Sequence, residues 1–462
     1  MNSDFFRLFT VEDFDQVEWA RLTLEGLKNM KIPMVHSYYQ AMTVIALLRV
    51  VNSRTLTLLF QDHTLRSHFV QKALSKKHIR KMTVQERVNN ERKSLTLFSI
   101  TRNGLNYIAQ KDSGLYELLF YQPNIAVFNL MESKASVRIK LAAISNTTVI
   151  AHSAGANIPS SSFGSIQNEA MGREEEDDEP QDADEIKTDR TYSLRDFYRD
   201  YLDEDSLLVS NAFEDEHSAD DDDYMIFYER GSIKSMLSQE SERGDIKDFQ
   251  SGRYTGILES HFKTVMMYVA PLYTMPWSRW LVNAEMNAYR MWGRTYSITD
   301  IRRQGKNLSM AAVIVNNARE FAYHFHGAKR RREKGEVFGG AYAHVYVIPN
   351  DHNGIRFLNW LMLIEDDSIQ KEMADMAIRS GNFTENETRS AAPFILRSRS
   401  GIETAVLLTM DSKQMLPIHY YASEKKETDL QVICFDWQED YLKRILPPNV
   451  SYWPIPFSII QE

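Results

Sequence analysis

The chain has 462 residues, a formal net charge of −9 and one cysteine, and 43% of its residues are hydrophobic. A chain of this length is too long to fold around one hydrophobic core, so two or three domains are expected. The apolar content excludes a chain that is disordered throughout. A single cysteine excludes an internal disulfide, and the first residues lack a basic segment followed by an apolar run, which predicts a cytoplasmic protein without a signal peptide.

The negative charge is concentrated in one segment. Residues 171–224 contain 22 Asp or Glu and 5 Lys or Arg, so the rest of the chain carries a net charge of +8. Because acidic runs repel themselves and have little to bury, we predict a largely disordered acidic linker over residues 151–250. This linker would separate a first domain, residues 1–150, from a second, residues 251–462.

Three helices are predicted in the first domain. Ser37–Val51 has apolar residues at helical spacing. Ser53 is expected to cap a short second helix that ends at Phe60, and Asp62 to cap a third helix over residues 63–77.

The third predicted helix has two different sides. Its apolar residues, among them Phe69 and Ala73, gather on one side at 100° per residue. The opposite side contains no acidic residue and consists of Thr64, Ser67, His68, Gln71, Lys72 and Ser75.

A β-hairpin is predicted directly after this helix. Its strands cover residues 79–88 and 93–100, and its tip is Asn89-Asn90, since asparagine tolerates positive φ. Arg87, Arg92 and Lys93 flank the tip and give it positive charge.

Helix, short helix, turn, helix and hairpin is the order of a winged helix-turn-helix. In that fold the polar face of the third helix would enter the major groove of double-stranded DNA, and the hairpin tip would neutralise phosphates. Winged helices also serve as protein-interaction modules. A protein-docking helix would need an apolar patch on its free face, which this helix lacks.

The second domain alternates strand and helix patterns. Strands are expected over 264–273, 311–317, 343–349 and 430–437, with a further antiparallel hairpin over 403–422. Helices are expected over 277–292, 316–325 and 352–363. This alternation predicts an α/β layer with a partly parallel sheet, so the whole chain is expected to be a multidomain α+β protein.

Two patterns suggest catalysis or metal binding, and each has a plainer alternative. Asp411 followed by Glu424-Lys425-Lys426 has the order of a metal-dependent nuclease site, although such triplets arise often by chance. His324 and His326, joined by His344 or His352, would supply zinc ligands, but packing and capping roles are more common. Glu285 is expected to be buried or paired, and we predict no metal and no cofactor.

A dense basic loop covers residues 328–335. Arg330, Arg331 and Arg332 lie at its centre and are candidates for phosphate contact; the alternative is an exposed charged loop without a ligand. The acidic segment 171–224 is a candidate to fold back on such basic surfaces and compete with DNA.

The hairpin-to-helix step Ile100-Thr101-Arg102-Asn103-Gly104-Leu105 resembles the Leu-Thr-x-x-Gly pattern of replication-relaxation family winged-helix proteins. Three stretches of the second domain, Gly252–Ser260, Tyr346–Leu361 and Leu430–Ile445, are similar to the C-terminal part of such proteins. The acidic insertion departs from the family pattern.

The resemblance implies an accessory or regulatory protein of a plasmid or integrative conjugative element in a Gram-positive bacterium. Its role in replication, conjugative transfer or transcription control would rest on sequence- or structure-specific DNA binding, with relaxase or replication proteins as partners. It also implies a restriction-endonuclease-like second domain, often without a complete active site. We also expect that two copies of the protein pair on a palindromic DNA site. No apolar stretch approaches the roughly 20 residues that cross a bilayer, so no membrane partner is expected.

Two other functions stay open. The second domain would be a nuclease if Asp411 and Glu424 held a metal ion. Alternatively, the chain would be an interaction scaffold that docks through the acidic segment and the aromatic tail Asn449–Ile460, where two prolines prevent an ordinary inner strand.

Overall fold

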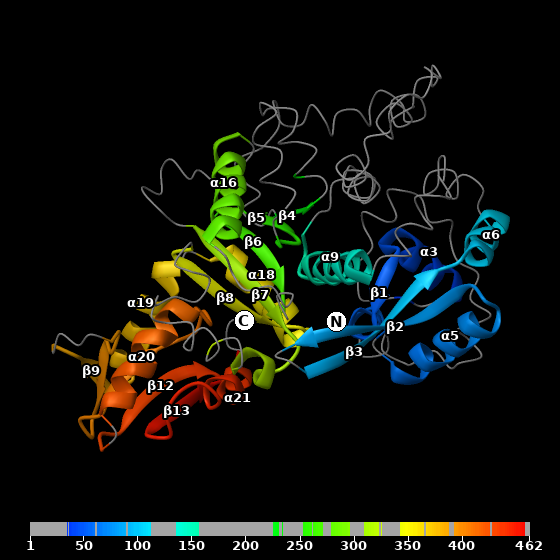
Figure 1. Ribbon diagram of the computed structural model, residues 1–462. Coiled ribbons are helices and arrows are strands. Elements are labelled where there is room, and N and C mark those ends of the chain that lie inside the picture. Colours follow the sequence, from blue (N-terminus) through cyan, green and yellow to red (C-terminus); the bar gives the residue numbers. More distant parts are fainter. Residues whose placement is uncertain are drawn as a thin grey trace. The chain divides into compact units, whose positions relative to one another are not determined.

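The part of the chain that the structure describes is a mixed α+β fold with three sheets, two of which combine parallel and antiparallel pairs. It divides into two compact units, Met1–Glu240 and Ser241–Glu462. The computed structural model (Figure 1) describes residues 35, 37–60, 62–88, 91–111, 135–156, 225–230, 233, 253–260, 262–270, 279–295, 309–322, 325, 342–364, 366–387, 392–425 and 427–457. Within these ranges no helix is both long and apolar enough to span a bilayer.

The described part of the first unit has the predicted order of three helices followed by a hairpin, with the unpredicted strand β1 between the first two helices (Figure 1). Its sheet is antiparallel with strand order β1-β3-β2. In chain order, the elements are α3 (Tyr38–Leu48), β1 (Val50–Asn52), α4 (Ser53–Leu59), α5 (His63–Ser75), β2 (Ile79–Val88), β3 (Glu91–Ile100), α6 (Arg102–Lys111), α9 (Ala135–Ser153) and β4 (Met225–Glu229).

The first predicted helix is shorter than expected. It ends at Leu48 because Arg49 has a positive φ of 62°, which interrupts the helix, and the next residues form β1. The cap of α4 also differs: Asn52 Oδ1 accepts from Thr55 N at 2.8 Å, so Asn52 is the N-cap and the predicted cap Ser53 is the first helical residue. The predicted Asp62 cap of α5 is confirmed, since its carboxylate accepts from Leu65 N at 3.1 Å.

The sequence did not predict α9, whose residues 141–151 are all buried. Its Leu141 and Ala142 pack against one face of the β1-β3-β2 sheet, where Val84 and Leu97 lie. The hydroxyl of Ser145 donates to Leu48 O at 2.9 Å. This helix therefore covers one side of the hairpin's base.

In the second unit, β5 (Gly256–Ser260), β6 (Thr264–Val269), β7 (Met310–Val315) and β8 (His344–Pro349) are neighbours in that order. β5 and β6 are antiparallel, while β6, β7 and β8 are parallel. The helices α16 (Arg279–Thr295), α18 (His352–Leu363) and α19 (Asp366–Arg379) complete this part. The predicted α/β layer with a partly parallel sheet is confirmed here.

A further sheet has the strand order β13-β12-β11-β10-β9. The strands β11, β12 and β13 are parallel and are joined by helical segments, whereas β10 pairs antiparallel with both of its neighbours. Its elements are β9 (Phe383–Glu385), β10 (Leu396–Ser398), β11 (Glu403–Val406), α20 (Ser412–Glu424), β12 (Leu430–Phe435), η4 (Asp436–Gln438), α21 (Glu439–Leu442) and β13 (Val450–Ile455). Part of the aromatic tail thus forms β13 at the sheet edge, where a strand containing Pro454 is tolerated.

The predicted hairpin over 403–422 is wrong, because its second half is the helix α20. Asp411 caps that helix by accepting from Lys413 N at 2.9 Å. Met415, Ile418 and Ala422 are buried at helical spacing, so the periodicity of burial outweighs the strand-like aromatic and β-branched composition.

Candidate nucleic-acid interface

The helix α5 is held at one side by aromatic packing. Phe69 is fully buried, with its ring centroid 5.4 Å from that of Tyr38 and 5.2 Å from that of Phe60. Ala73, one turn later, is also buried. Because these residues fix the inner side of α5, the opposite side of the helix is presented outward.

The six residues predicted for DNA contact lie on that opposite side to different extents. Thr64, Gln71 and Ser75 are exposed, and Ser67, His68 and Lys72 are half-buried. The ammonium group of Lys72 lies 5.1 Å from the ring centroid of Tyr38, a cation–π distance. The outer side of α5 is thus polar and contains no carboxylate.

The β2–β3 ribbon has ten register pairs, from Ile79↔Ile100 to Val88↔Glu91. Alternation along each strand separates the ribbon into two rows. One row contains Val84 and Leu97, which pack with α9. The other row is polar towards the tip, since Lys81, Thr83 and Gln85 are exposed. One face of the ribbon is therefore occupied by apolar packing while the other remains available.

The predicted ribbon tip is described only in part. Arg87 pairs with Arg92, and Lys93 with Glu86, in the backbone register. Asn89 and Asn90 lie outside the described residues, as do the candidates Arg330, Arg331 and Arg332 of the basic loop.

Three further exposed lysines, close in the chain to the predicted residues, were not among the predicted contacts, and the ammonium group of Lys76 lies 5.8 Å from the Tyr38 ring centroid. Lys76 and Lys77 are exposed at the end of α5, and Lys81 is exposed on the polar row of β2. The sequence contained a signal for these lysines. Charged residues that lie between a predicted helix and a predicted strand are expected to be exposed to solvent. We call Lys76, Lys77 and Lys81, with the exposed Thr64, Gln71 and Ser75 of α5, the cationic face.

The Thr-x-x-Gly motif ties the ribbon to α6. The Thr101 hydroxyl donates to the carbonyl of His78, 3.0 Å away, and accepts from Gly104 N at 3.2 Å. A β-carbon on Gly104 would overlap the His78 carbonyl and lie 2.8 Å from Met42 Cε. The Thr101 hydroxyl thus caps the start of α6, and Gly104 allows the backbone of α6 to lie against the backbone at the base of the ribbon.

His78 is a packing residue at this base. Its Nδ1 lies 2.9 Å from the hydroxyl of Tyr38, and its ring stacks on Tyr107 with centroids 4.9 Å apart. Burial lowers the pKa of His78, and the charge of Lys76 lowers it further. The imidazole is therefore neutral at pH 7 and adds no charge to the cationic face.

The proposed nuclease triplet does not assemble. Asp411 caps the start of α20 and Glu424 is its last residue, so helical rise separates them by roughly 20 Å. One metal ion cannot be held by both carboxylates, and Lys425 follows at the far end. Within the described ranges, no group of three His, Cys, Asp or Glu residues could hold a metal ion. His324 and His326 lie outside those ranges.

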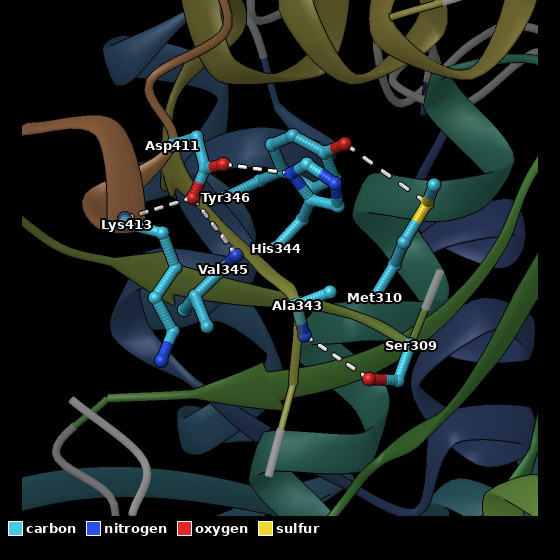
Figure 2. Close-up of polar contacts among 8 residues, drawn as sticks. All are labelled: Ser309, Met310, Ala343, His344, Val345, Tyr346, Asp411 and Lys413. Atoms are coloured by element: carbon cyan, nitrogen blue, oxygen red, sulfur yellow. Dashed lines mark hydrogen bonds and ion pairs between the residues drawn. The ribbon is translucent and has the colours of Figure 1, made fainter. Parts of the chain in front are cut away.

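Asp411 has a structural role instead, in contacts that sequence reasoning did not foresee (Figure 2). Its carboxylate is buried, lies 2.8 Å from His344 Nδ1 and accepts from Val345 N at 3.0 Å. Met410 O also accepts from Val347 N at 3.1 Å. These bonds attach the start of α20 to β8, and Figure 2 shows the Lys413 side chain directed away from the carboxylate.

Glu285 is buried and hydrogen-bonded, in agreement with the expected structural role. It accepts from Arg253 N at 2.6 Å and from the Tyr268 hydroxyl at 3.1 Å, and Tyr268 lies 2.6 Å from the hydroxyl of Tyr342. Burial raises the pKa of both tyrosines, and the charge of Glu285 raises it further. The tyrosines remain neutral donors, which is the arrangement of a satisfied core network.

Comparison of the chain with protein-family models, with curated proteins and with solved structures finds no match to any of them.

Proposed function

We propose that the first unit contains a winged helix-turn-helix that binds double-stranded DNA through the cationic face and the ribbon tip. The observation that supports this proposal is the polar, carboxylate-free outer side of α5 beside a ribbon whose other row is covered by α9. A helix that docked on protein would expose apolar side chains there.

The charge of this region supports a polyanionic partner. Residues 37–111 contain 13 Lys or Arg and 3 Asp or Glu, although the whole chain is negative. Neutralisation of phosphates by lysine and arginine releases counterions and supplies most non-specific DNA affinity. A basic region, residues 37–111, inside an acidic chain is therefore suited to bind DNA.

The proposal extends to the whole chain as an accessory or regulatory protein of a mobile genetic element, which acts in replication, transfer or transcription control. This extension depends on the resemblance of the Thr101–Gly104 step to replication-relaxation proteins. Relaxase or replication proteins are its proposed partners, and the proposal includes no catalytic step.

Three triple variants test the DNA-binding proposal. Lys76, Lys77 and Lys81 are replaced by alanine in the first, and Arg87, Arg92 and Lys93 in the second. A matched control replaces the exposed cations Arg356, Lys371 and Arg379 of the second unit. Affinity for duplex DNA is measured by fluorescence anisotropy at several salt concentrations.

Each of the first two variants is expected to bind more weakly, and the slope of log affinity against log salt should become shallower by about 2 to 3. The control should keep the slope of the unmodified protein. If both test variants bind as the unmodified protein does, the DNA-binding assignment is wrong.

A further inference from the structure

Gln71 lies on α5 directly opposite the buried side of the helix. Phe69 and Ala73, two residues before and after it, are buried, and at 100° per residue each lies about 160° away from Gln71 around the helix axis. Gln71 is exposed, and within the described part of the chain its side-chain amide makes no hydrogen bond. By contrast, the hydroxyl of Ser75, one turn later, donates to Lys72 O at 2.9 Å. Gln71 therefore presents an unused donor and an unused acceptor on the cationic face.

The arginine and the lysine of α5 have other contacts. A guanidinium N–H group of Arg66 donates to the Thr57 hydroxyl on α4, and Arg66 lies about 140° from Gln71 around the helix axis. The ammonium group of Lys72 lies 5.1 Å from the ring centroid of Tyr38, and Lys72 is half-buried. Neither cation is therefore placed beside Gln71 at the centre of the outer side of α5.

We propose that Gln71 determines the base specificity of DNA binding, and that the preferred DNA site contains an adenine that the Gln71 amide contacts in the major groove. This inference rests on the proposed function, because it requires that the outer side of α5 lies against duplex DNA. It goes further by naming the base that is recognised and the side chain that recognises it.

The hydrogen-bonding groups of the four bases select adenine for this side chain. Adenine presents the N7 acceptor beside the N6 amino donor, which matches the NH₂ donor and the oxygen acceptor of one carboxamide. Guanine presents two acceptors, N7 and O6, for which arginine or lysine is the matching side chain. Cytosine presents an amino donor, which suits a carboxylate, and the described outer side of α5 contains none.

The lysines of the cationic face have a different role from Gln71. Contacts to phosphates fix the position of a protein on the duplex but read no sequence. Lys76, at the end of α5, is therefore expected to contribute to the affinity for every duplex equally. Gln71 is expected to contribute only where an adenine lies opposite it, so variants of the two residues distinguish base recognition from phosphate binding.

An adenine analogue tests this inference. Selection from a random duplex library by the full-length protein identifies the preferred site. Each adenine of that site is then replaced in turn by 7-deazaadenine, which keeps base pairing but has a C–H group in place of the N7 acceptor. Fluorescence anisotropy measures the affinities of the unmodified protein, of Gln71→Ala and of the control Lys76→Ala. Because Gln71 is exposed and alanine favours helices, Gln71→Ala is expected to fold.

At one adenine of the site, the analogue is expected to weaken binding by the unmodified protein about three- to tenfold, the effect of one lost hydrogen bond. Replacement of the same A·T pair by G·C should weaken it by roughly 5- to 150-fold, the usual value of a bidentate base contact. Gln71→Ala should bind the natural and the analogue duplexes equally. Lys76→Ala should bind both more weakly by one common factor and so keep the full discrimination.

Three results would decide against one or both proposals. If Gln71→Ala discriminates against the analogue at every position as the unmodified protein does, another residue reads the adenine and the inference is wrong. A protein that binds duplex DNA without any dependence on an adenine N7 would also overturn the inference, while the proposed function stood. Absence of duplex binding by the unmodified protein would reject the proposed function itself.

Discussion

The carbonyl oxygen of His78 occupies the space in which a β-carbon of residue 104 would stand, so Gly104 lets α6 start directly against the base of the ribbon. Helix interiors usually favour alanine over glycine by about 1 kcal/mol. At this position the close approach of two backbone segments reverses that preference.

Replacement of Gly104 by Ala is therefore expected to destabilise the first unit by about 1 to 3 kcal/mol, the usual cost of overpacking a tight site. Hydrogen exchange of the α6 and β2 amides would measure the change. The matched control Asn106→Ala, at an exposed position of the same helix, should leave stability unchanged or raise it slightly. A stabilised Gly104→Ala protein would contradict the described contact.

The packing of α9 on the ribbon gives a second prediction. Leu97 is fully buried against Leu141 and Ala142, so Leu97→Ala should cost about 2 to 5 kcal/mol through the cavity it leaves. Faster hydrogen exchange in both α9 and β3 is the expected readout. Ser94→Ala, at an exposed position of β3, is the control. Unchanged exchange in α9 would show that the helix does not depend on this contact.

The contacts of Asp411 predict that its carboxylate stabilises the second unit. Removing its carboxylate leaves Val345 N without its acceptor and removes the cap of α20, so Asp411→Ala should cost about 2 to 4 kcal/mol. Urea unfolding followed by tryptophan fluorescence would report this change. Asp375→Ala, on the exposed side of α19, should have little effect. Equal stabilities of the two variants would disprove the structural role of Asp411.

His78 predicts a pH dependence of stability. Burial lowers its folded-state pKa below the ordinary value of 6.5, so the unfolded chain takes up a proton first as pH falls. The free energy of unfolding of the first unit should therefore decrease from pH 6.5 downward to the folded-state pKa, with no contribution from this group above 6.5. His78→Phe should show a weaker decrease between pH 7.5 and 5.5. A control at the exposed Asn106 of α6, Asn106→Ala, should keep the full dependence.

The single cysteine predicts a chemical probe of the second unit. Burial raises the pKa of Cys434 to about 12, and the charge of Glu439 adds to the shift. A thiol reagent at pH 8 should therefore modify the native protein far more slowly than the urea-unfolded protein. An introduced cysteine at the exposed position 400 should react at once in the native state. Rapid modification of native Cys434 would contradict its burial.

The sequence predicted those features of the first unit that depend on local signals. The cap Asp62, the helix α5 and the two ribbon strands are set by neighbouring residues, and the periodicities of 3.6 and 2 make them visible. By contrast, α9 gave no amphipathic signal because Leu141–Ile150 is buried on all sides and includes the polar run Ser145–Thr148. Thr147 and Thr148 donate to carbonyls within α9, while Ser145 and Asn146 bond to Leu48 and Thr55, and a single sequence does not reveal these tertiary contacts.

In the second unit, the buried strands were predictable from the sequence, whereas the helix α20 was not. Strands such as β7 and β8 were found because both of their faces are buried and apolar. The segment after Asp411 was misread, since Tyr and Ile favour strands in isolation, whereas the cap and the buried stripe of α20 decide the outcome. The nuclease hypothesis depended on the order of Asp411 and Glu424-Lys425-Lys426 along the chain, and the helix α20 between them keeps the two carboxylates apart.

Pro454 in the edge strand β13 affects the tendency of this protein to aggregate through that edge. A strand at the rim of a sheet offers its unused amide groups to any other extended chain, which is a common start of aggregation. Proline has no amide hydrogen, so position 454, which pairs with Cys434 in the register, leaves this strand with one donor fewer. Proline in an edge strand disfavours growth of this sheet by addition of further strands.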